Sequence, residues 1–217
     1  PWIDRGAHRT PTRRRAVITT VIAGFVGVVA LTALGWRDRP LNAELQEGWG
    51  VRAIGGRMMA ANAGCTKCHA ATGAADPLEG ITVTRGKDWL SGHMVDPEMI
   101  APGLREPPRT LNERQVAAIV AYVDELSQQP YPGFPPEVET ASAIFARYCI
   151  GCHRLGGDGG DEGPDLTKAG AKHDTAALRT WIADPEAVDP EADMPAFADR
   201  LTSEQLDIIA RYLAGRK

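Results

Sequence analysis

Apolar residues form one long uncharged run and two later segments with helical spacing. The run covers residues 16–36, and as a helix it would rise about 30 Å, the thickness of the hydrocarbon core of a bilayer. Downstream, apolar residues recur at helical intervals over 111–126 and 201–215, behind the capping residues Asn112 and Thr202. The pattern predicts a transmembrane helix over 16–36, followed by helical domains.

Arginines flank the uncharged run unequally. Five precede it in the segment 1–15, and two follow it, Arg37 and Arg39. An excess of basic residues marks the cytoplasmic side of a membrane helix, so residues 1–15 are expected there and residues 37–217 outside. The run is longer than the 7–15 apolar residues of a signal peptide. The expected location is therefore the cytoplasmic (inner) membrane, single-pass, with the later domains on the periplasmic or extracellular side.

The rest of the chain reads as two similar units joined by a proline-rich segment. Residues 37–126 form the first predicted domain, 127–137 a stiff extended linker, and 138–217 the second domain. Each unit has a helical stretch, a cysteine motif, a Gly/Pro-rich loop, a Trp-containing helix that ends at Asp-Pro, and a final amphipathic helix. The predicted fold class is all-α, with one N-terminal transmembrane helix and two tandem domains.

Composition and charge narrow the class of protein. Aromatic residues make up 6% of the chain, which is little for two protein cores unless a large apolar group helps to fill them. Residues 1–39 carry seven arginines and two aspartates, whereas both later domains are net acidic. A concentrated basic face is absent from those domains, which argues against nucleic-acid binding and favours a cationic partner.

All four cysteines lie in two motifs of the form C-x-x-C-H. These are Cys65–His69 and Cys149–His153. Two thiols at this spacing reach the two vinyl groups of one porphyrin, and the following histidine lies under the iron as its proximal ligand. The motifs therefore predict two covalently attached c-type haems, bound by Cys65, Cys68, Cys149 and Cys152, with His69 and His153 on the irons. A zinc site or a redox C-x-x-C pair are the alternatives.

The order of elements around these motifs resembles the class I cytochrome c fold twice over, across about residues 50–216. In that family a methionine from a Met-Pro loop before the last helix is the sixth iron ligand. The resemblance implies this role for Met194, which precedes Pro195. It also implies that the carbonyl groups of Pro164 and Pro77 accept a hydrogen bond from the ring of the proximal histidine.

The first domain departs from this pattern at the sixth ligand. When Asp96-Pro97 is aligned with Asp184-Pro185, Glu106 takes the place of Met194. Met99, seven residues earlier, is the first choice for the distal ligand. His93 and Met94 on the preceding helix, Glu106 itself, and the absence of a protein ligand remain as alternatives.

The N-terminal segment PWIDRGAHRTPTRRR and the following apolar run resemble the C-terminal part of cytochrome b of quinol-oxidising cytochrome bc complexes. This resemblance covers about the first 36 residues and implies a dihaem electron-transfer subunit of a quinol–cytochrome c reductase. Its partners would be cytochrome b-type and iron–sulfur subunits, and a cytochrome, oxidase or reaction centre as acceptor. A subunit of a terminal oxidase or dehydrogenase is the alternative, and a dihaem peroxidase is a further one. We expect no catalytic residues in the chain by itself.

Overall fold

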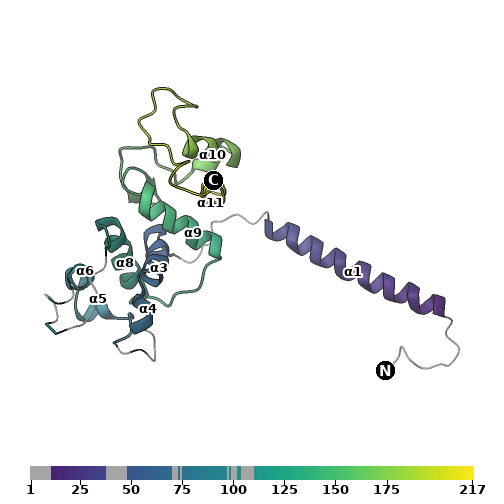
Figure 1. Cartoon of the computed structure of the whole chain (residues 1–217), viewed down its shortest axis with the longest axis horizontal. Coiled ribbons are helices and arrows are strands. Elements are labelled where there is room, and N and C mark those ends of the chain that lie inside the picture. Colours follow the sequence, from purple (N-terminus) through teal and green to yellow (C-terminus); the bar gives the residue numbers. More distant parts are fainter. Residues whose placement is uncertain are drawn as a thin grey trace. The chain divides into compact units, whose positions relative to one another are not determined.

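The computed structural model describes residues 11–37, 48–69, 73, 75–96, 98, 102–103 and 110–217. The chain divides into two units, Pro1–Arg39 and Pro40–Lys217. The first unit contains the helix α1 (Pro11–Arg37), and the second contains both cysteine motifs (Figure 1).

The uncharged run lies in α1, where the structure describes the side chains of residues 17–31. In the described part of the chain, no helix is long and apolar enough to cross a membrane. The predicted transmembrane helix over 16–36 is therefore wrong, and so is the predicted single-pass location in the inner membrane.

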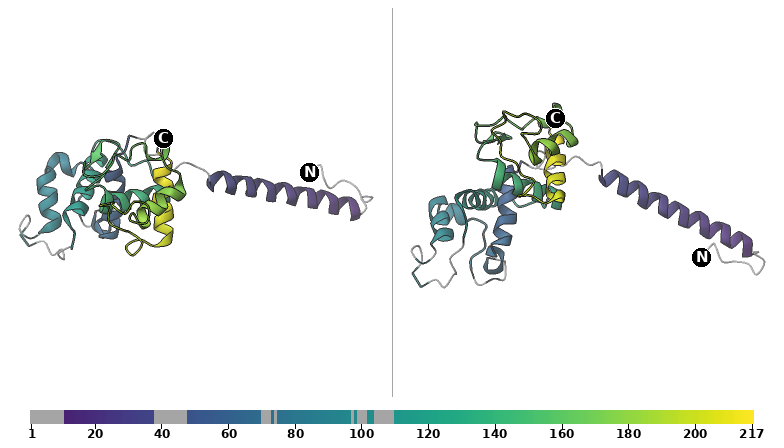
Figure 2. Two further views of the ribbon diagram at one scale, coloured as in Figure 1. Left: turned by 90° about the horizontal axis from the view of Figure 1, so that it is seen from above. Right: turned by 45° about the horizontal axis from the view of Figure 1, so that its top comes forward.

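The second unit is built mainly from helices in the predicted order. The helices of the first predicted domain are α3 (Val51–Asn62), α4 (Cys65–Cys68), α5 (Ile81–Thr84), α6 (Lys87–Val95) and α8 (Glu113–Leu126). Those of the second are α9 (Pro136–Ile144), the π-helical turn η1 (Phe145–Cys149), the 3-10 turn η2 (Ala169–Ala171), α10 (Thr175–Ala183) and α11 (Ser203–Ala214). Figure 2 shows the yellow α11 beside the light-green α10, and the two helices are in contact.

A small antiparallel sheet corrects the prediction of an all-α fold. Strands β1 (Arg154–Leu155) and β2 (Asp158–Gly159) pair directly after the second motif. The two residues between them, Gly156 and Gly157, both have positive φ values, of 62° and 89°. Such backbone suits a two-residue hairpin turn and favours glycine. Strands of two residues are too short to show an alternating pattern, so no hydrophobic periodicity indicates them.

Helix α3 packs between α8 of the first domain and α9 of the second (Figure 1). Two adjacent glycines allow this close approach. A Cβ atom at Gly56 would lie 1.8 Å from the carbonyl oxygen of Ala118 in α8, and one at Gly55 would lie 2.6 Å from that of Ser142 in α9. The backbones therefore meet where any side chain would collide.

The two predicted domains share one hydrophobic core rather than forming separate ones. An ion pair also joins them: Arg52 of α3 donates to both carboxylate oxygens of Asp158, at 2.8 Å and 2.6 Å. The hydrogen bond to Asp158 raises the pKa of Arg52. The segment 127–137, expected to be an extended spacer, contributes to this core through Phe134 and through Tyr131, whose ring meets that of Trp49 edge-on at 5.0 Å.

The repeat is visible in the backbone where the Trp-containing helices end. Asp96 after α6 has φ −142° and ψ 83°, and Asp184 after α10 has φ −149° and ψ 86°. Both residues precede a proline, which disfavours helical backbone at the residue before it. The final helices repeat as well, because Asn112 and Thr202 each form a reciprocal capping box with a glutamine three residues on. The predicted helices over 111–126 and 201–215 and their caps are thus confirmed.

Candidate haem sites

The second motif begins at the end of η1 and turns its histidine toward the following loop. The Nδ1 atom of His153 lies 2.9 Å from the carbonyl oxygen of Pro164, so the ring N–H donates to that oxygen. This is the contact that the resemblance implied for Pro164. Because Nδ1 is engaged, Nε2 is the nitrogen that remains for a metal.

Glycines bring the loop after the motif close to His153. A Cβ atom at Gly163 would lie 2.4 Å from Cε1 of the His153 ring, and one at Gly159 would lie 2.1 Å from the His153 carbonyl oxygen. Just beyond Pro164, the backbone N–H and the hydroxyl of Thr167 both donate to the carboxylate of Asp165. These hydrogen bonds lower the pKa of Asp165. The loop thus holds the Pro164 carbonyl group beside the histidine.

Met194 lies in the same cavity as the second motif. The cavity has a volume of about 420 Å³. Its lining includes Cys149, Cys152, His153, Trp181, Met194 and Phe197. A covalent haem requires two thiols for its vinyl groups, an imidazole and often a thioether for its iron, and apolar walls around the porphyrin, and this cavity has all of these. The residues present therefore fit the group that the motif predicts, while the bond from Met194 to iron stays a prediction.

The thiols of the second motif are in different surroundings. Desolvation raises the pKa of the Cys149 thiol to about 12. The Cys152 thiol donates to a Glu162 carboxylate oxygen at 3.2 Å, and this hydrogen bond raises its pKa. No disulfide joins the four cysteines. Among the described residues, no group of three or more His, Cys, Asp or Glu side chains could hold a metal ion.

The first motif has a comparable local geometry. Helix α4 carries both cysteines, and the Nδ1 atom of His69 lies 2.6 Å from the carbonyl oxygen of Asp76. The resemblance had implied Pro77 as the acceptor, but the acceptor is the carbonyl group of the preceding residue, Asp76. Nothing in the sequence distinguished the two neighbouring carbonyl groups. As at the second motif, Nε2 of the histidine is the nitrogen left for iron.

A narrow cavity lies beside His69. Its described lining is Ala60, Cys65, His69, Leu78, Ile81, Trp89, Leu90, His93, Met94 and Ile119, and these residues leave about 30 Å³ open between them. The structure thus brings His93 and Met94 to the first motif. Met99 and Glu106, the other candidates for the distal ligand, lie outside the described residues.

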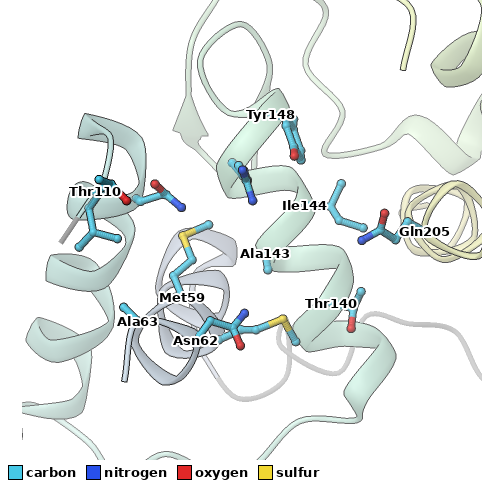
Figure 3. A pocket seen from close by; sticks show the side chains of 13 residues that line it. Met59, Asn62, Ala63, Thr110, Thr140, Ala143, Ile144, Tyr148 and Gln205 are labelled. Atoms are coloured by element: carbon cyan, nitrogen blue, oxygen red, sulfur yellow. The ribbon is translucent and has the colours of Figure 1, made fainter. Parts of the chain in front are cut away.

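A third cavity is distinct from the two that the motif residues line. It has a volume of about 560 Å³ and is lined in part by Met58, Met59, Tyr148 and Gln205, which belong to α3, η1 and α11 (Figure 3). None of the motif cysteines or histidines lines it. Met58 and Met59 are therefore not candidates for iron ligands in this arrangement.

Sequence comparison identifies the second motif as part of a known kind of domain. A family model described as cytochrome c oxidase, cbb3-type, subunit III matches residues 136–213, which include Cys149, His153 and Met194. The chain is thus a c-type cytochrome, and this cytochrome c domain implies a covalently bound c-type haem. No solved structure matches the chain.

Three curated relatives are similar to the chain. "Cytochrome c oxidase subunit 2" of Alkalihalophilus pseudofirmus is 34% identical over 32% of this chain and 22% of its own length. The protein of the same name from Bacillus sp. strain PS3 is 32% identical over 38% of this chain and 27% of its own length. "Thiosulfate dehydrogenase electron acceptor" of Thiomonas intermedia is 26% identical over 71% of this chain and 79% of its own length.

The first two relatives are much longer than the matched region, and the chain spans about a quarter of their length. These matches and the cytochrome c domain support an electron-transfer cytochrome.

Proposed function

We propose that the chain carries two covalent c-type haems, one on each C-x-x-C-H motif, and relays electrons between them. The observation that carries this proposal is the shared geometry of the motifs. In each, the Nδ1 atom of the histidine donates to a carbonyl group of the following loop, to Asp76 at 2.6 Å and to Pro164 at 2.9 Å. Each ring therefore keeps one orientation and one free nitrogen for iron. The chain by itself acts as an electron carrier and not as an enzyme.

The surroundings of the second haem site suggest the charge of its partner. Glu162, Asp189 and Asp193 are among the residues that line the cavity. The chain carries a formal net charge of −4 at pH 7. A positively charged donor or acceptor would be steered to this acidic rim, and its association rate would fall as ionic strength rises. This supports a protein partner with a basic contact surface.

For the assembly, we propose an electron-transfer subunit of a quinol–cytochrome c reductase of the bc type. The support is the resemblance of PWID and the arginines after it to cytochrome b, in residues outside those that the structure fully describes. Cytochrome b-type and iron–sulfur subunits would be its neighbours. The acceptor would be a cytochrome, an oxidase or a reaction centre. A subunit of an oxidase or dehydrogenase complex is the second candidate, favoured by the names of the three relatives.

A haem count tests the dihaem proposal. We expect two haems per chain in a pyridine haemochrome assay, both retained after acid–acetone extraction. The double variants Cys65→Ala/Cys68→Ala and Cys149→Ala/Cys152→Ala should each retain one haem, because each removes both thioethers of one motif. A single haem in the unmodified chain, lost only with Cys149 and Cys152, would contradict the proposal.

The assembly is tested by the source of electrons. In the native complex, a quinol should reduce both haems of this chain, and an inhibitor of quinol oxidation should block that reduction. Reduction that is insensitive to such an inhibitor but driven by a soluble donor would favour the second candidate.

A further inference from the structure

Two histidine rings of the first haem domain lie close together. The ring centres of His69 and His93 are 6.2 Å apart, and their planes are nearly perpendicular, at 86°. Both side chains line the same narrow cavity beside Cys65. His69 is the predicted proximal ligand, and the hydrogen bond from its Nδ1 atom to Asp76 leaves its Nε2 atom for iron.

This separation is the one that a metal held between two imidazoles requires. A metal–imidazole nitrogen bond is about 2 Å long, and the nitrogen lies about 1.1 Å from the ring centre, so two rings on opposite sides of one metal have centres about 6 Å apart. Rings in direct stacking contact can come closer, as His93 itself does to Trp89 at 5.1 Å. We propose that His93 is the sixth ligand of the first haem iron. This assignment rests on the proposed function, in which Cys65 and Cys68 hold that haem.

The corresponding position in the second domain supports the assignment. Counting back from Asp96 and Asp184, His93 in α6 corresponds to Trp181 in α10, and each lines the cavity of its own motif. The second domain thus has Trp181 at the helix position and Met194 in the loop. The first domain has His93 at the helix position and Glu106 in the loop. In this assignment a ligand on the helix replaces the thioether that Met194 offers at the loop position of the second domain.

Helix α6 also holds the His93 ring in place. The indole of Trp89, one turn earlier, stacks on it with an angle of 8° between the planes. The Arg85 guanidinium lies 5.3 Å from the centre of the Trp89 ring. Leu90 and Met94 are 4% and 5% exposed and anchor the helix in the core. Met94 belongs to this packing, whereas the centre of the His93 ring lies 6.2 Å from that of His69, a distance compatible with a metal between the two rings.

The assignment gives the two haems different properties. Imidazole is a harder donor than a thioether and favours ferric iron, whereas methionine favours ferrous iron and raises the potential. The first haem should therefore have the lower potential. Electrons would pass downhill from the first haem to the second.

The test uses the full chain with both haems. In the oxidised protein, near-infrared magnetic circular dichroism and electron paramagnetic resonance should show one bis-imidazole haem and one imidazole–thioether haem in equal amounts. His93→Ala should abolish the bis-imidazole signal, leave the thioether signal unchanged, and let the ferrous first haem bind carbon monoxide. His93→Met should convert the lost signal into a second thioether signal and raise the lower potential, which a purely structural role for His93 would not produce.

Met94→Leu and Met99→Leu are the matched controls, and both should leave the spectra unchanged. Thioether signals from both haems, or a bis-imidazole signal that survives His93→Ala, would overturn the ligation while leaving the dihaem proposal intact. A haem count of one would overturn the proposed function and this ligation with it.

Discussion

The two domains that carry the C-x-x-C-H motifs use the same backbone frame but differ in the residues near the motif histidine. Both end their Trp-containing helices at an Asp-Pro step with nearly the same dihedral angles, and both cap their final helix with the same reciprocal hydrogen bonds. In the second domain a methionine from the loop lies near the histidine, and in the first a histidine from the helix does. Single side chains can thus change the chemistry of a site while the fold stays the same.

The largest expected effect concerns the methionine of the second domain. Met194→Ala should lower the potential of the second haem by about 100 mV or more, because a ligand that stabilises ferrous iron is removed and axial ligands tune haem potentials over about 0.8 V. The thioether charge-transfer band should disappear with it. Redox titration with optical detection measures both quantities.

Met58 provides the control for this substitution, because it lines a cavity that no motif cysteine or histidine lines. Met58→Ala should leave both potentials in place. If Met194→Ala also leaves them in place, Met194 serves only in packing, and the contrast between a loop ligand and a helix ligand is lost.

A smaller effect is expected where the two domains meet. Gly56→Ala should lower the free energy of unfolding by about 1–3 kcal/mol, since its Cβ atom would collide with the backbone of α8 and the helices must separate. Urea denaturation followed by far-ultraviolet circular dichroism measures the change. Gly50→Ala, at the N-terminus of the same helix α3 with no atom near its Cβ position, should cost less than about 1 kcal/mol. Equal effects of the two substitutions would argue against a tight α3–α8 contact.

The smallest effects test whether the domains unfold together. Asn112→Ala and Thr202→Ala each remove one capping box and should each cost about 1 kcal/mol. Because the domains share one core, both substitutions should shift a single denaturation transition. Two transitions, each responding to only one of the substitutions, would show that the domains are independent. Thr202→Ser should restore most of the loss, since a serine hydroxyl can accept the same hydrogen bond.

Local signals predicted the helical parts of this fold well. The caps at Asn112 and Thr202 and the Asp-Pro steps mark the ends of their helices because each satisfies or blocks a backbone hydrogen bond within a few residues. The hairpin at Gly156 and Gly157 was missed, since two-residue strands show no periodicity. The expected membrane helix was inferred from an uncharged run and its flanking arginines, whereas in the described part of the chain no helix is long and apolar enough to cross a membrane.

The site was predictable where covalent spacing decides it and less so where tertiary packing does. The spacing of each C-x-x-C-H motif predicts directly which cysteines would attach a haem and which histidine would bind its iron. Which carbonyl group meets the histidine depends on the path of the loop, so Asp76 takes the role expected of Pro77. His93 and His69 are 24 positions apart in the sequence, and their proximity follows from the packing of α6, which no local pattern indicates.

The two adjacent glycines of α3 have a consequence for the timing of electron flow. Because Gly55 and Gly56 press one helix against both α9 and α8, neither domain can swing away from the other without opening a tightly packed backbone contact. If both motifs carry a haem, as proposed, the separation of the two irons would be a constant of the fold rather than a fluctuating quantity. The rate of transfer between them should accordingly be insensitive to solvent viscosity, unlike the rate in carriers that must rotate or dissociate to deliver an electron.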